Sequence, residues 1–260
     1  YVVSCVAPSS GINNGVVSCS SSPTTIDPDF GQKFKMVSKT PPFAHSYLLS
    51  SVLSADYSDL TGDGITEDDL GNYTKFNYTM KDANYQWRTP YNNNEGQFDR
   101  GVQSDCHDDK ATFIVGNKEI WMLHSIESRN FVAEFYTSSR SDALGSYDPL
   151  LAHGHNRSYK LDKIELYSKR DRLNIDGSIN NSATPIKTVH FTYDYSLCKG
   201  ILNKNPLAGN IGKLALRSIS IKYGKSDIGY LSPYKFEYGG AMSGNTSITI
   251  NPNYDQTAKD

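Results

Sequence analysis

"IKTVHFTYDYSL", residues 186–197, is the stretch of this chain that decides its fold. β-Branched and aromatic side chains take alternate positions from Val189 to Tyr195, and polar side chains take the positions between them, from His190 to Asp194. A period of two residues places successive side chains on opposite faces of an extended backbone. We therefore expect an amphipathic β-strand here.

Runs of the same kind recur along most of the chain. They are "TKFNYTM" (74–80), "ATFIVGNKEIWMLHSI" (111–126), "NFVAEFYTS" (130–138), "YKLDKIELYSK" (159–169), "KLALRSISIKYG" (213–224) and "YKFEYGG" (234–240). Gly116 and Asn117 lie between two apolar runs and predict a hairpin turn, and "ESRN" (127–130) predicts another.

Within 213–224 the alternation changes phase. Leu214 and Leu216 share one phase, and Ile219 and Ile221 share the other. An extra residue in one strand produces such a change, so we expect a β-bulge at 217–218. Apolar residues at helical spacing are confined to "AHSYLLSSVLS" (44–54) and the short "TEDDLGNY" (66–73).

These patterns predict a mainly β protein, an antiparallel meander that forms a sandwich or a strongly twisted sheet, with one or two short helices. Residues 1–35 are rich in Ser, Pro, Gly and Asn and are expected to form a polar N-terminal hairpin or arm. Residues 36–260 are expected to form a single β-rich domain, since β domains of this size are often undivided.

Composition bears on compartment and partners. The net charge is −2 and the pI about 6.3, which gives no general attraction to nucleic acid. No apolar run approaches the roughly 20 residues that span a bilayer. Few charged residues and 18 tyrosines are typical of a secreted or cell-surface protein. The chain starts at Tyr1 without an initiator Met, so we expect a fragment whose partners are other segments of a parent polypeptide.

Two of the four cysteines lie near the N-terminus, where "VVSC" occurs at 2–5 and again at 16–19. The "NNG" between these copies is a turn signal, and it would let Cys5 and Cys19 face each other across a hairpin and form a disulfide. Two buried free thiols are the alternative. The other two cysteines are expected to be separate thiols.

The order of segments carries a family resemblance. "HSYLLSSVLSADYSDLTGDGITEDDLGNYTKFNYT", "YQWRTPY", "KEIWMLHSIESRNFVAEFY", "KLDKIELYSK" and "IKTVHFTYDYSLCKG" together resemble a segment of very large secreted proteins of Bacteroidota. The closing "LSPYKFEYG" resembles the strand-and-turn style of Rhs/YD-repeat and SpvB-like toxin shells. The resemblance implies a secreted or cell-surface β segment and brings no catalytic residues with it.

The function expected from these observations is that of a noncatalytic structural or adhesion segment. A carbohydrate-binding module is the alternative, because Tyr85, Trp87 and Tyr91 in "YQWRTPYNNNEGQ" would suit a stacking platform for sugar rings, unless these rings pack in the core. A fragment of a glycan-active enzyme is the third reading. Its carboxylate clusters, such as Glu67 with Asp68, lie in polar stretches where solvation explains them equally well.

The stretch "DLTGDG" (59–64) begins as many calcium loops do. Asp59, Thr61 and Asp63 take loop positions 1, 3 and 5, and the carbonyl of Ile65 takes position 7. Gly64 takes position 6, where the chain must turn sharply. Hard oxygen donors at alternate positions predict a structural calcium ion.

The match fails at position 12, where Leu70 replaces the expected acid, and Asp69 is one residue early. Asp69, or Asp68 beside it, is therefore the expected final ligand of a shortened loop. An ordinary helix start competes with this reading, since Thr66 and Asp69 have the spacing of a capping box.

Overall fold

The computed structural model describes residues 2–6, 12–13, 16–18, 36–89, 91, 95–98, 110–146, 156–174, 176–201 and 203–238. Eight of its strands follow one another as an antiparallel meander: β5 (Ser51–Leu53), β6 (Tyr73–Thr89), β8 (Lys110–Ser128), β9 (Phe131–Leu144), β10 (Arg157–Ser168), β11 (Lys187–Leu197), β12 (Lys213–Tyr223) and β13 (Tyr234–Lys235).

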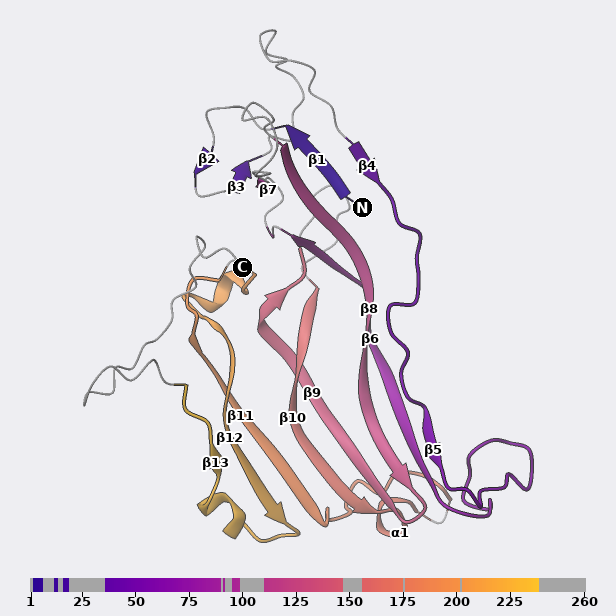
Figure 1. The fold of residues 1–260 in the computed structure, drawn as a ribbon. Coiled ribbons are helices and arrows are strands. Elements are labelled where there is room, and N and C mark those ends of the chain that lie inside the picture. Colours follow the sequence, from indigo (N-terminus) through magenta and orange to yellow (C-terminus); the bar gives the residue numbers. More distant parts are fainter. Residues whose placement is uncertain are drawn as a thin grey trace, which may run out of the picture.

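The remaining elements are short. They are β1 (Val2–Val6), β2 (Ile12–Asn13), β3 (Val16–Ser18), β4 (Met36–Ser38), β7 (Glu95–Phe98), the helix α1 (Lys169–Arg172) and the 3₁₀ turns η1 (Pro206–Ala208) and η2 (Ile228–Leu231). All strands belong to one sheet (Figure 1). The predicted mainly β meander is confirmed, and it forms a twisted sheet rather than two packed ones.

The sheet buries few side chains completely. The buried apolar residues form two groups, one near the β8–β9 turn and one toward the opposite ends of these strands: Tyr73, Val132 and Tyr167; Tyr85, Leu144, Ile201 and Ala215. Most other side chains of the sheet are half-buried. The described part of the sheet therefore has a thin core at each end.

The predicted bulge in 213–224 is confirmed. Thr192 lies opposite Ser218 and Tyr193 lies opposite Leu216, so Arg217 is the extra residue of β12. The predicted turn at 127–130 is also confirmed, because it joins β8 to β9.

A second bulge lies in β8. Asn77 of β6 is opposite Ser125, and the next residue, Tyr78, is opposite Leu123, which leaves His124 as the extra residue. At this point β8 leaves β9: the two strands pair only at residues 125–127 and 132–134 and then separate, as Figure 1 shows. Because a bulge increases the local twist, it accounts for the separation.

At the opposite end β6 reaches the ends of β9 and β10. The hydroxyl of Tyr85 donates to the carbonyl of Ala143 at 2.9 Å, and the amide of Ser146 donates to the carbonyl of Gln86 at 2.9 Å. A Cβ on Gly145 would lie 2.6 Å from that same carbonyl oxygen, so only glycine permits this approach. Along their middle β8 and β9 are thus unpaired, and they are linked at both ends. We call this separation of the two strands the β8–β9 fork.

The hairpin predicted at Gly116 and Asn117 is wrong, because β8 runs through both residues. Gly116 lies opposite Trp87, and a Cβ there would come within 3.0–3.1 Å of the indole ring. The glycine leaves space for the indole ring of its cross-strand neighbour. In the sequence alone, a glycine with this role resembles a glycine in a turn.

Both predicted helices are also wrong. Residues 44–54 contain β5 and an irregular stretch, and residues 66–73 form bends that lead into β6. In the first case the ladder with β6 replaces helical hydrogen bonds: the amide of Phe76 donates to Ser50, and the amide of Ser54 donates to Asn72. Among the described residues a short α-helix, α1, does form, but it lies elsewhere in the chain.

In the N-terminal part, β2 and β3 pair on either side of Asn14 and Gly15, as the turn signal predicts. β1 does not pair with β3. Instead it pairs with β8 and β4, and Cys5 lies opposite Ala111 in the ladder. Cys19 is outside the described residues, so the disulfide stays a prediction.

Candidate functional site

The acidic loop, residues 55–72, is the segment between β5 and β6. It contains six Asp and Glu residues and no Lys or Arg. Its ends are held by the Ser58–Leu70 bridge, in which each amide donates to the other residue's carbonyl. Asp59, Asp63 and Asp69 each place a carboxylate oxygen within 4.8 Å of the others. The three predicted carboxylate ligands are therefore brought together.

Asp69 is the structural centre of the loop and is 1% exposed. Its carboxylate accepts hydrogen bonds from the hydroxyl of Tyr57 (2.5 Å), the amide of Thr66 (2.9 Å) and the amide of Leu60 (3.2 Å). The bond from Thr66, and then that from Tyr57, lower the pKa of Asp69 below its usual value. The bond to Asp69 in turn raises the pKa of Tyr57 to about 12. Asp69 is thus a buried, ionised carboxylate at neutral pH.

The bond from Thr66 to Asp69 is one half of the predicted capping box. The helix is missing because Asp69 also accepts from Tyr57 and Leu60, which precede Thr66 and draw the chain into a compact loop. The predicted cap residues are in contact, but they close a loop instead of starting a helix.

Asp59 and Asp63 are exposed and arrange the tip of the loop. The two oxygens of Asp59 accept the amides of Gly62 (2.6 Å) and Gly64 (3.1 Å). One oxygen of Asp63 accepts the hydroxyl of Thr61 at 2.7 Å. Of the other predicted ligands, Thr61 is therefore tied to the cluster through Asp63, and Ile65 is half-buried at the centre of the loop.

This donor set suits calcium. Calcium binds six to eight oxygens at about 2.3–2.6 Å, so two ligand oxygens on opposite sides of one ion lie about 5 Å apart. The oxygens of the three carboxylates lie within 4.8 Å of one another, which is close enough for one ion to reach all three. Each carboxylate oxygen has about two acceptor sites, so the present hydrogen bonds leave lone pairs for an ion.

The acidic loop is attached to the β8–β9 turn and to α1. The guanidinium of Arg129 donates to the backbone carbonyl of Asp69. The ammonium of Lys169 lies 3.2 Å from Glu67 of the loop and 3.2 Å from Glu127 of β8. One buried cation therefore joins the loop to the sheet.

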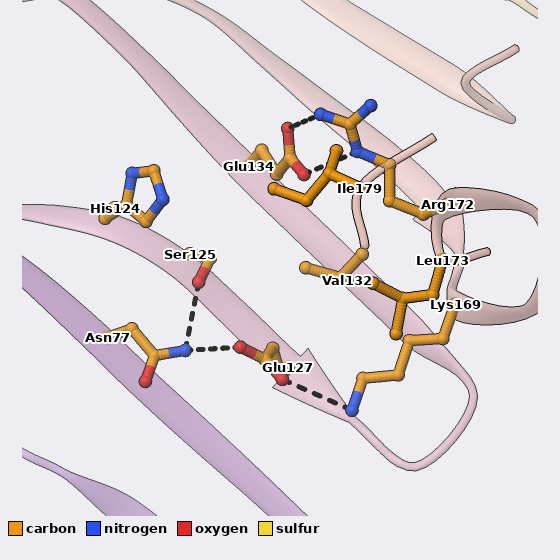
Figure 2. A pocket seen from close by; sticks show the side chains of 10 residues that line it. All are labelled: Asn77, His124, Ser125, Glu127, Val132, Glu134, Lys169, Arg172, Leu173 and Ile179. Carbon is orange, nitrogen blue, oxygen red and sulfur yellow. Dashed lines mark hydrogen bonds and ion pairs between the residues drawn. The ribbon is translucent and has the colours of Figure 1, made fainter. Parts of the chain in front are cut away.

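Beside this attachment lies the fork hollow, about 360 Å³ in volume, at the point where β8 and β9 separate. Figure 2 shows the residues that line it: Asn77, His124, Ser125, Glu127, Val132, Glu134, Lys169, Arg172, Leu173 and Ile179. Sequence reasoning missed this site. Its charged residues come from separate elements, and no local spacing connects them.

Ion pairs neutralise the charges of the hollow. Arg172 donates to both oxygens of Glu134, at 2.7 and 2.9 Å (Figure 2). Tyr136 donates to the same carboxylate at 2.6 Å. Burial raises the pKa of Glu134, but the bonds from Arg172 and Tyr136 outweigh it and the net shift is downward. Burial and the bond to Glu134 raise the pKa of Tyr136.

Lys169 follows the same logic. Burial lowers the pKa of its ammonium, but the hydrogen bonds with Tyr73, Glu67 and Glu127 together raise the pKa by more than burial lowers it. The net shift is upward, so the ammonium stays charged. In the fork hollow each acid has a cation or hydroxyl partner and each cation has an acid. Such groups hold one another in place, whereas an acid–base catalyst needs a carboxyl whose pKa is close to the working pH.

The three aromatic residues predicted to bind sugar are engaged with the protein. Tyr85 is 8% exposed and bonded to Ala143, and the hydroxyl of Tyr91 donates to the carbonyl of Gly145 at 3.2 Å. Trp87 is half-buried and faces Gly116. The arrangement favours the core-packing alternative for these rings over an exposed platform.

No helix among the described residues is long and apolar enough to cross a membrane. Comparison of the chain with protein-family models, with curated proteins and with solved structures finds no match.

Proposed function

We propose that this chain is a noncatalytic structural or adhesion segment of a larger secreted or cell-surface protein, and that neighbouring β segments extend its sheet. The two edges of the meander carry the proposal. Among the described strands, β5 pairs only with β6, and β13 pairs only with β12. Each edge strand therefore presents one free row of backbone groups.

Both edges also expose large apolar side chains. Near β5 these are Phe43, Tyr47, Leu48, Leu49, Val52 and Leu53, and near β13 they are Ile228, Tyr230, Leu231, Tyr234, Phe236 and Tyr238. Soluble monomers usually protect an edge with charge, proline or a covering element, because an apolar edge pairs with other strands. Residues 43–53 contain no Asp, Glu, Lys or Arg. These two edges are therefore better suited to pairing with another strand than to exposure to water.

The fork hollow supports a noncatalytic role. Its ion pairs connect the acidic loop, β8, β9 and α1, and so stabilise the place where the sheet divides. The same proposal includes a calcium ion at Asp59, Asp63 and Asp69. The ion would fix the tip of the acidic loop, whereas the hydrogen bonds of Asp69 fix the base of the loop.

Hydrogen exchange tests the edge proposal. The isolated chain, at a dilution at which it is monomeric, and the full product of its gene are compared at the amides of β5 and β13. We expect these amides to exchange slowly only in the full product. Equal exchange in both, or a gene that encodes this chain alone, would contradict the proposal. Specific binding on a glycan array would favour the carbohydrate-binding alternative.

Calorimetry tests the ion. Calcium is titrated into chelator-treated wild type and into Asp63→Ala. Asp56→Ala is the matched control, since Asp56 is an exposed acid of the same loop outside the three-carboxylate cluster. We expect heat and a rise in melting temperature for wild type and Asp56→Ala only. No heat with wild type would remove calcium from the proposal.

A further inference from the structure

The two edges of the meander differ in charge. The β5 edge, residues 43–72, contains six acids and no Lys or Arg, while the β13 edge, residues 213–238, contains five basic and two acidic residues. Glu67 is ion-paired with Lys169, and the proposed calcium ion would offset two more charges, so the β5 edge stays negative. Two of those basic residues are ion-paired, Arg217 with Asp194 and Lys222 with Asp227. Lys225 and Lys235 have no ion-pair partner among the described residues, so the β13 edge stays positive.

Strand direction is also complementary. The meander from β5 to β13 has eight strands with antiparallel neighbours, so its first and last strands run in opposite directions. A second copy placed beside the first by simple translation would set its β5 antiparallel to the first copy's β13. The antiparallel alternation would continue without a break.

The backbone groups point the right way for this contact. The carbonyl of Ser50 accepts from Phe76 and the amide of Ser54 donates to Asn72, so the even-numbered residues of this strand face β6. The N–H groups of Ser51 and Leu53 therefore point to the open edge. At the other edge the amide of Phe236 donates to the carbonyl of Arg217 in β12. By the same alternation, the backbone of Lys235 faces outward.

We propose that the partner at each edge is a second copy of this chain, joined head to tail through β5 of one copy and β13 of the next. The inference rests on the proposed function. Two-fold contacts are disfavoured, because a β5–β5 contact would bring two acidic loops together and a β13–β13 contact would bring two basic edges together. A head-to-tail contact repeats and builds a ring or a filament.

Two single-edge variants test this. Ser51→Pro removes an outward N–H and leaves the β6 ladder intact, since proline is tolerated at an open edge. Lys235→Glu reverses a charge on the β13 edge. Lys199→Glu, in the exposed turn after β11, makes the same charge change away from both edges. Circular dichroism and melting temperature establish that each variant folds.

Sedimentation of the isolated 260-residue chain at low salt should show an average mass that rises beyond that of a dimer as the protein concentration increases. Added salt should lower this mass. Ser51→Pro and Lys235→Glu should each weaken association by at least about tenfold, and Lys199→Glu should not. A mixture of the two edge variants should form a dimer and stop, because each supplies the edge that the other lacks.

A monomeric wild type, or an edge-variant mixture that stays monomeric while wild type associates, would overturn the inference. Slow exchange of β5 and β13 amides in the full gene product would then still support the proposed function, with a dissimilar neighbour at each edge.

Discussion

At Gly145 a missing Cβ lets the end of β9 touch the backbone of β6. Gly145→Ala would place a methyl group 2.6 Å from the carbonyl oxygen of Gln86, and backbone cannot move aside as a side chain can. We expect a loss of about 1–3 kcal/mol in the free energy of unfolding, measured with urea. Gly116→Ala meets the side chain of Trp87 instead and should cost less. Equal stability of Gly145→Ala and wild type would contradict this account.

Asp69 makes the acidic loop sensitive to acid. Because its pKa is lowered in the folded state, its contribution to stability is complete above the unfolded value of about 3.9 and is lost as the pH falls through the folded value. Asp69→Asn should melt at a lower temperature than wild type at pH 7. The difference should shrink below about pH 4. A difference that is the same at pH 7 and pH 3 would show that the charge of Asp69 is unimportant.

At the residue scale the sequence predicts the cluster of Asp59, Asp63 and Asp69 because its members are close along the chain. It does not predict the partners of Asp69. Tyr57 and Arg129 approach it only after the loop and the β8–β9 turn have folded, and nothing in their spacing distinguishes them from surface residues.

At the scale of elements, α1 is held to β9 by a nearly buried ion pair. The side chains of Arg172 and Glu134 are 10% and 15% exposed. Removing one partner of such a pair costs about 3–5 kcal/mol, because the other charge is left buried. Arg172→Met should therefore destabilise the chain by about that amount in urea unfolding. Adding Glu134→Leu should restore most of the loss, and a double variant as unstable as the single one would count against the argument.

The alternation of apolar and polar residues locates most strands, because it depends only on the two faces of a single segment. The Arg217 bulge was also predictable, because the extra residue shifts the pattern within a single strand. The bulge at His124 left no such trace, since β8 is half-buried along much of its length and its alternation is weak. The hairpin predicted at Gly116 was wrong for a related reason. A glycine that leaves room for a large neighbouring side chain cannot be distinguished in the sequence from a glycine that a turn requires.

For the whole molecule, protection should fall from the centre of the meander to its edges. β9 and β10 share a long ladder, whereas β12 and β13 share only two residue pairs. We expect amides of β10 to exchange far more slowly than those of β13 in the isolated monomer, because local opening follows the number of contacts that must break. Uniform exchange across the sheet would contradict this.

The separation of β8 from β9 has a mechanical consequence. It divides the sheet into two plates, β5–β6–β8 and β9–β13, that share a ladder of three residue pairs at one end. At the other end they are fastened by the hydrogen bonds of Tyr85 and Ser146, and by those from Tyr91 to Gly145 and from Asn156 to Asn84. When those bonds release, the short ladder becomes a hinge. A force applied across the strands would then rotate the two plates apart before any long ladder breaks. The fork therefore lets the sheet separate locally while both plates stay folded.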